Sequence, residues 1–513
     1  MSQNHGGSTV YTQCIHGGST MWWFHRGSTV VAGPRGLDNR IKTLDLQCFP
    51  DLYPYGKNSQ CEERNVPLTA FEYIKARLKS ADSRFRLNQQ YLFFLLNDAN
   101  IRQLGASVYH TLNITNAREK YTAKSYLKHL KDGQLEANLT TLFARLRNSE
   151  QFWSKPRNNL ACMTRHYGPA IWFFTVSPAE RLWDDLIEYI KEINAPHFDK
   201  LSASEVIAAD PVSVSRYIDN KFQAVLEFIK SDSQPLGPLS HYFWRREYQG
   251  RGIQHFHLIL WVEGAPIMGI NTNEEVVEFI MKYVTCKLPD KKISPTLYRR
   301  VTTHQQHNHN SYCLRTKKPK SAGRRNLKSK SRLYDLPRNE NEVNINDYNP
   351  SVLSVWEGNM DIQFIGEKST ILTQYVTKYA TKREITKSSE TINEINSTKT
   401  LPQLLWKIVF RSLTHREVGA LEAADTLLGI SLHGTDSETI IKWLDVRMIR
   451  NRKLKTKVEI EELEHNDPES TEIFCPSLID DYYPNRPKDL ENLCLYNFAK
   501  WIIFEKTVTR LLN

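Results

Sequence analysis

The sequence predicts an α+β fold, in which a small antiparallel sheet with helices is flanked by helical N- and C-terminal regions. Three observations support this class. Residues 241–266 alternate large side chains around a glycine-containing turn, which is typical of a β-hairpin. Residues 168–190 read as an apolar strand that gives way to a helix. The flanking segments carry apolar residues at spacings of three and four, as amphipathic helices do.

Length and charge bound the class of protein. The chain has 513 residues, which suggests about three domains. Its 68 Lys and Arg outnumber 57 Asp and Glu, so the net charge of +11 favours a polyanionic partner over an acidic protein or a membrane surface. Eight cysteines without the spacing of a disulfide scaffold favour a reducing compartment. We find no signal peptide and no apolar run near about 18 residues, so we expect a soluble intracellular protein without a membrane partner.

The first element along the chain is a leader at residues 1–37. It contains HGGST at 5–9, the same pentapeptide at 16–20, and HRGST at 25–29. A histidine-rich tract can bind metal, but small Gly, Ser and Thr repeats are more typical of flexible chain. We therefore expect this low-complexity leader to be disordered.

Three further regions follow the leader. Residues 38–160 predict a helical N-terminal subdomain, and residues 396–513 predict a helical C-terminal region that gives structural support. Residues 161–395 should form the core, with a basic insertion near residues 300–345. The core contains every residue that we single out below for chemistry.

The core begins with the apolar strand and helix of residues 168–190. Ser177 can cap the helix, Pro178 suits the first helical position, and Glu180 stands three residues after Ser177, as in a capping box. We therefore expect the helix to begin directly after Ser177. In the sheet that this strand joins, helices should cover one face.

The hairpin comes next and carries two histidines. Residues in a strand that are two apart share a face, so His255 and His257 point the same way. Phe256, Leu258 and Leu260 form the opposite, apolar face, which can pack against a core. With a turn at residues 250–252, Glu247 faces His255 across the hairpin. Two imidazoles and a carboxylate can hold a divalent cation such as Mg²⁺ or Mn²⁺, and Gln249 is the next ligand candidate if the register differs. A pair of histidines on a half-exposed strand is the plainer alternative.

Downstream of the hairpin, four polar side chains follow the helical repeat. Tyr375 and Tyr379 stand four residues apart, and Lys378 and Lys382 repeat that spacing. A tyrosine stripe is more often part of a core, but lysines rather than leucines alternate with these tyrosines. Phenols have a pKa of about 10 and need nearby cations or a metal to act as nucleophiles. The pattern predicts a helix that presents phenolate nucleophiles to a phosphate.

Taken together, these two elements resemble a known nuclease family. A strand with His-hydrophobic-His followed by a helix with Tyr-x-x-x-Tyr resembles the HUH single-strand endonucleases of the two-tyrosine class. The stretches FPDLYPYG, WEGNMDIQFIGEKSTILTQYVTKYATK and LTHREVGALEAADTLLGISLHG resemble the Helitron transposase in its replication-initiator nuclease region, the Helitron helicase-like N-terminal domain. This resemblance covers approximately residues 45–505. It implies an HUH endonuclease core for the predicted α+β fold.

The resemblance also implies an activity. A metal-dependent endonuclease would cut single-stranded DNA, form a 5′-phosphotyrosine intermediate and transfer the strand during rolling-circle transposition. The first alternative is a catalytically inactive, domesticated single-stranded DNA-binding protein. The second is a metal-dependent hydrolase that uses water as its nucleophile. Such a protein would be nuclear if the organism is eukaryotic, and its partners would be the transposon ends and the target DNA.

Two groups of residues extend the expected sites. Zinc could be ligated by His304, His307, His309 and Cys313. The family resemblance implies a further cysteine where this chain has Ser331, so the loss of that thiolate makes zinc doubtful. For DNA contact we expect basic residues of the hairpin and of the block at residues 314–332, with Trp244 as a stacking partner. The basic residues are Arg245, Arg246, Arg251, Lys317, Lys318, Lys320, Arg324 and Arg325.

A helicase usually accompanies this nuclease in the family, but the sequence offers no ATP site. A phosphate-binding loop ending at Lys368 would need glycines where Ile362 and Glu367 stand. We therefore expect that a helicase is supplied separately or is missing from this fragment.

Overall fold

The computed structural model describes residues 10–16, 19–26, 29–32, 43–112, 114–116, 146–248, 252–307, 336–367, 417–436, 451–453, 455 and 457–501. The chain divides into two compact units that are not consecutive in sequence. The first comprises Met1–Ile101, Trp153–Arg383 and Arg416–Ser437, and the second comprises Arg102–Phe152, Glu384–His415 and Glu438–Asn513. The N-terminal helices up to Ile101 therefore belong to the same unit as residues 153–383.

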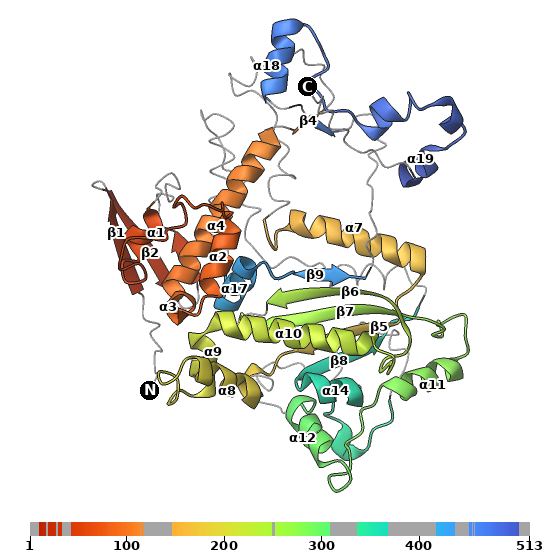
Figure 1. Cartoon of the computed structure of the whole chain (residues 1–513). Helices are drawn as coiled ribbons and strands as arrows, with labels where there is room; N and C mark the ends of the chain where they lie inside the picture. The colour runs from red at the N-terminus through yellow and green to blue at the C-terminus, as the bar shows by residue number, and fades with distance from the viewer. Residues whose placement is uncertain are drawn as a thin grey trace, which may run out of the picture. The chain divides into compact units, whose positions relative to one another are not determined.

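The first unit is built on a five-stranded antiparallel sheet with the strand order β8-β5-β7-β6-β9 (Figure 1). The strands are β5 (Trp172–Ser177), β6 (Leu239–Tyr248), β7 (Gln254–Val262), β8 (Asn359–Phe364) and β9 (His433–Thr435). Helices surround this sheet, so the predicted α+β class is confirmed.

The β6–β7 hairpin has the register that we predicted. Glu247 pairs with His255, and Arg245 pairs with His257. Gly252 has a φ of 78°, a left-handed conformation that glycine adopts without a steric penalty. The hairpin thus sets Glu247 beside the two histidines.

One face of the sheet packs into the main core. Phe256, Leu258 and Leu260 of β7 are buried there, as the alternation predicted. The Phe256 ring stacks on Phe222 of α10 (Pro211–Lys230), with ring centroids 3.9 Å apart. Each such fully buried apolar side chain stabilises the fold by about 1.5–3 kcal/mol.

Helices also cover part of the opposite face, which we had expected to carry none. In Figure 1, α7 (Glu150–Tyr167) and α10 lie on opposite sides of the sheet. Leu160 and Met163 of α7 belong to a smaller core cluster with Phe243, Ile259 and Trp261 of the sheet. The histidine face is therefore apolar away from the histidines.

The chain after β5 differs from the predicted capping box. A short 3₁₀ helix covers Glu180–Leu182, and α8 (Asp184–Ile193) begins only after Trp183. Ser177 remains the last residue of β5, and its hydroxyl contacts His255 instead of capping a helix. The strand register thus overrides the local capping signal.

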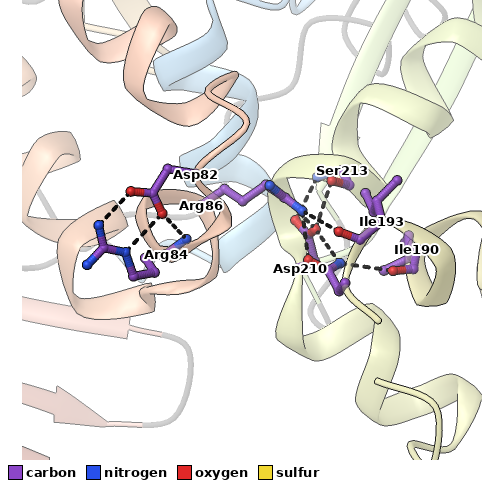
Figure 2. A network of polar contacts seen from close by, with 8 residues as sticks. Asp82, Arg84, Arg86, Ile190, Ile193, Asp210 and Ser213 are labelled. Carbon is purple, nitrogen blue, oxygen red and sulfur yellow. Dashed lines mark hydrogen bonds and ion pairs between the residues drawn. The ribbon is translucent and has the colours of Figure 1, made fainter. Parts of the chain in front are cut away.

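A buried polar network at the start of α10 connects this helix to α3 (Ser83–Leu87) of the N-terminal region (Figure 2). Asp210 caps the helix by accepting from the Ser213 backbone N–H at 3.0 Å. Its other oxygen accepts from Arg86 Nε at 3.0 Å, and Arg86 also donates to Asn194 Oδ1 at 2.7 Å. Arg86 and Asp210 are both buried, and this pair joins α3 to the core.

The remaining helices of the first unit include α2 and α4, which lie in the N-terminal region that was predicted to be helical. A capping box between Thr69 and Glu72 opens α2, whereas α4 continues into the second unit. The bounds are α1 (Leu44–Cys48), α2 (Ala70–Leu78), α4 (Gln89–Leu112), α9 (Ala203–Ala209), α11 (Asn273–Tyr283), α12 (Pro295–His304), η2 (Glu340–Glu342), α14 (Pro350–Trp356) and α17 (Ala420–Leu428).

Within the leader, the structure describes three strands. Strands β1 (Val10–His16), β2 (Ser19–Arg26) and β3 (Thr29–Ala32) form an antiparallel sheet. The register pairs His16 with Ser19 and Arg26 with Thr29, so two residues separate consecutive strands. Those residues are Gly-Gly and Gly-Ser, which are typical of two-residue hairpin loops.

In the second unit, β4 (Ile114–Asn116) pairs antiparallel with β10 (Asn451–Lys453). The helical elements that follow are α18 (Lys457–Asn466), η3 (Leu478–Tyr482), η4 (Lys488–Leu490) and α19 (Leu495–Trp501). Throughout the described residues of both units, no helix is long and apolar enough to cross a membrane.

Candidate metal centre

His255 and His257 share one face of β7, with Glu247 of β6 beside them. His257 Nε2 lies 3.0 Å from Glu247 Oε2, and the two imidazole rings have centroids 4.6 Å apart. The His257 side chain is 4% exposed and the Glu247 side chain is 27% exposed. The hairpin therefore gathers the two imidazoles and the carboxylate that the sequence predicted to lie together.

The neighbouring strand β5 contributes two hydroxyls that we did not predict. Thr175 Oγ1 lies 3.2 Å from His257 Nδ1, and Ser177 Oγ lies 2.7 Å from His255 Nδ1. The register pairs Thr175 with His257, so both hydroxyls point to the histidine face. Alternation in the stretch WFFTVS places Thr175 and Ser177 on one face, but only the strand pairing identifies the histidines as their partners.

Local charges keep the carboxylate ionised. Burial raises the pKa of Glu247, but the hydrogen bond from His257 and the positive charge of Arg245 lower it more, so the net pKa lies below its ordinary value. Glu247 is therefore an anion at neutral pH. A half-buried anion beside two imidazoles is an electrostatically favourable place for a divalent cation.

The donor set fits a divalent metal ion, but the side chains are not yet arranged around one. Imidazole nitrogens and a carboxylate oxygen are ligands for Mn²⁺, and the carboxylate also suits Mg²⁺. Within the part of the chain that the structure describes, no group of three or more His, Cys, Asp and Glu side chains is arranged to hold a metal ion. His257 Nε2 and Glu247 Oε2 are engaged with each other. A metal that uses all three residues would therefore replace this hydrogen bond.

Three of the hairpin residues that we expected to contact DNA are buried, which corrects the expectation for those three. Arg245 and Arg246 are both 0% exposed, and Trp244 is also buried. The Arg245 guanidinium lies 4.5 Å from the centroid of the Trp153 ring. Arg246 points to the opposite face and pairs with Asp425 at 2.7 Å and with Asp219. Strand alternation and covering helices therefore place these groups out of reach of a DNA phosphate.

Several predicted site residues lie outside the described residues and stay predictions. They are the nucleophile candidates Tyr375 and Tyr379 with Lys378 and Lys382, the ligand candidate Gln249, the zinc candidates His309 and Cys313, and the basic residues Arg251, Lys317, Lys318, Lys320, Arg324 and Arg325.

Two zinc candidates do fall within the described residues. His304 is the last residue of α12, and His307 follows shortly after it. Burial lowers the pKa of His304; the negative charge of Glu357 partly opposes this, and the positive charge of Arg300 adds a smaller lowering effect. A neutral imidazole is the form that ligates a metal. The predicted zinc site remains a prediction because its other two ligands are not described.

The fold and this face define an α+β protein with a histidine and carboxylate site on an antiparallel sheet. The family model described as "Helitron helicase-like domain at N-terminus" matches residues 67–260, a range that includes Glu247, His255 and His257. The chain is therefore Helitron-related. No curated protein matches it.

Proposed function

We propose that this protein is a metal-dependent endonuclease and strand transferase that acts on single-stranded DNA in rolling-circle, Helitron-type transposition. The observation that carries the proposal is the gathering of Glu247, His255 and His257 on one sheet face inside the Helitron-related region. Asp and Glu side chains are common on protein surfaces, but two imidazoles held by neighbouring hydroxyls beside a half-buried carboxylate fit a metal centre.

In this proposal, Glu247, His255 and His257 hold a Mg²⁺ or Mn²⁺ ion. Such an ion withdraws charge from phosphoryl oxygens and orients a phosphate for in-line attack. Thr175 and Ser177 keep the imidazoles in place, and Arg245, on the same face of the hairpin, lowers the pKa of Glu247.

The tyrosines predicted from the sequence supply the nucleophile. The phenol oxygen of one tyrosine, Tyr375 or Tyr379, attacks the scissile phosphorus and loses its proton, and it forms a 5′-phosphotyrosine ester while the P–O3′ bond breaks and the leaving 3′ oxygen takes up a proton. The other tyrosine carries out the second transfer in the same way. Lys378 and Lys382 stabilise the phenolates or bind flanking phosphates.

Single-stranded DNA at the transposon ends and at the target is the proposed partner. A net charge of +11 favours this polyanion. Unwinding would come from a helicase on a separate chain or beyond this sequence, and a eukaryotic source would place the protein in the nucleus. The basic block at residues 314–332 is the proposed DNA-contacting segment.

The first test is adduct formation. The full chain is incubated with a pool of single-stranded oligonucleotides and Mn²⁺, and denaturing electrophoresis detects a covalent protein–DNA species. We expect the adduct to disappear in Tyr375→Phe plus Tyr379→Phe, and the single variants then order the two transfers. The variant Tyr496→Phe, which changes a surface tyrosine that is 70% exposed, is the matched control.

Two other outcomes would replace the proposal. Cleavage without an adduct would show a hydrolase that uses water. DNA binding with neither cleavage nor adduct, across pools that include the transposon ends, would favour the domesticated DNA-binding protein.

A further inference from the structure

The two hydroxyls of β5 have a role that follows from their contacts. We infer that Thr175 and Ser177 are positioning residues of the metal centre, which hold the rings of His257 and His255 so that Nε2 is the nitrogen presented to the ion. This inference rests on the proposed metal site and deepens it. Neither side chain touches the ion or the substrate.

The contacts come as a pair with the same geometry. Thr175 and Ser177 are two residues apart on β5, as His255 and His257 are on β7. The Thr175 hydroxyl lies 3.2 Å from His257 Nδ1, and the Ser177 hydroxyl lies 2.7 Å from His255 Nδ1. Thr175 and His257 are both at most 9% exposed, so water cannot readily replace this contact. A ring whose Nδ1 is held in this way cannot flip without leaving a buried polar atom unpaired, which costs about 1–3 kcal/mol.

A hydroxyl suits His257 because it can both donate and accept. The Glu247 carboxylate oxygen near His257 Nε2 only accepts, so that nitrogen carries a proton in the present arrangement. A neutral ring then accepts from the Thr175 hydroxyl at Nδ1. When Nε2 binds a metal instead, the proton resides on Nδ1 and is donated to Thr175 Oγ1. Thr175 therefore keeps its contact in both tautomers, which a carbonyl or an ammonium group could not do.

The phenylalanine beside the site restricts the ring further. Phe173 stacks on His257 with ring centroids 5.7 Å apart and planes 9° from parallel. Stacking fixes the plane of the ring but does not distinguish its two nitrogens. The hydroxyl is thus the group that selects which nitrogen faces Glu247.

Substitutions at β5 test this role in the full chain. Thr175→Val keeps the branched shape and removes only the hydrogen bond, and Ser177→Ala does the same for His255. We expect each to weaken Mn²⁺ binding, measured by EPR titration, by about 10–100-fold. Thr175→Ser restores the hydroxyl and should bind Mn²⁺ nearly as the unmodified protein does. Thr302→Val is the control, because that hydroxyl donates to the Tyr298 carbonyl oxygen within α12, at 3.0 Å.

A second readout needs no metal. With ¹⁵N-labelled histidine, the ring nitrogen shifts of His255 and His257 report the tautomer of each ring, and His→Ala variants assign the signals. We expect Thr175→Val to change the His257 signals and to leave His255 nearly unaltered, and Ser177→Ala to do the reverse. Far-UV circular dichroism confirms that each variant is folded.

The outcomes separate this inference from the proposed function. Unchanged ring shifts and unchanged Mn²⁺ affinity in both variants would overturn it, as would a Thr175→Ser protein as weak as Thr175→Val. If the unmodified protein binds no Mn²⁺, the metal centre of the proposed function fails. Altered ring shifts would then still show that the hydroxyls orient the imidazoles.

Discussion

The two faces of the β6–β7 hairpin carry charged residues in different states. On the back face, Arg246 and Asp425 are both 0% exposed, and Asp425 also accepts from the Tyr248 hydroxyl at 2.6 Å. On the front face, Glu247 is 27% exposed and forms a hydrogen bond with His257. The back-face groups are held by one another, whereas the front-face groups can exchange a hydrogen bond for a ligand.

Arg246 and Glu247 are adjacent in sequence but lie on opposite faces of the hairpin. Burial lowers the pKa of Arg246, but Asp425, Tyr248 and Asp219 raise it well above its ordinary value, so the guanidinium remains charged inside the protein. This pair links α17 to the hairpin directly behind the candidate site. Buried ion pairs on the back face therefore hold the strand whose front face carries the proposed metal site.

The largest expected effect comes from breaking the back face. Asp425→Asn leaves the buried Arg246 charge with only Asp219, so we expect a loss of about 3–5 kcal/mol in the free energy of unfolding, measured by urea denaturation. Asp436→Asn, which breaks a more exposed pair with His241, is the control and should cost less than about 1 kcal/mol. Equal losses in the two variants would mean that burial does not distinguish the pairs.

The front face should show the reverse balance between stability and function. Glu247→Gln keeps an oxygen that accepts from His257, so we expect unfolding to become easier by only about 1 kcal/mol. The loss of the anionic ligand should abolish Mn²⁺-dependent adduct formation. Urea denaturation and the adduct assay measure the two effects. A variant that loses stability as Asp425→Asn does, or that still forms the adduct, would contradict the assigned roles.

The smallest effect is a pH dependence. The pKa of Glu247 in the folded protein lies below its ordinary value, so the folded state holds the ionised form more tightly than the unfolded state does. Its contribution to stability is present above the unfolded pKa, about 4.3, and is lost as pH falls through the folded pKa. The difference in urea midpoint between the unmodified protein and Glu247→Gln should therefore shrink as the pH falls through this range. If the difference in urea midpoint grew as the pH fell, the pKa of Glu247 would be raised in the folded protein rather than lowered.

Much of the hairpin could be predicted because its rules are local. The turn length fixed the pairing of Glu247 with His255, and alternation correctly assigned Phe256, Leu258 and Leu260 to the core. The same local rules failed at Ser177, where a strand pairing outweighed a capping signal.

The sequence by itself determined the α+β class, the hairpin register and the shared face of His255 and His257, since these depend on spacing within one segment. Only the tertiary structure decided that Thr175 and Ser177 meet the histidines, because these partners lie 82 and 78 residues apart in sequence. It likewise decided that Arg246 is buried, because its partner Asp425 lies 179 residues away. Spacing is encoded locally, whereas the burial and pairing of a polar group depend on which distant segment packs against it.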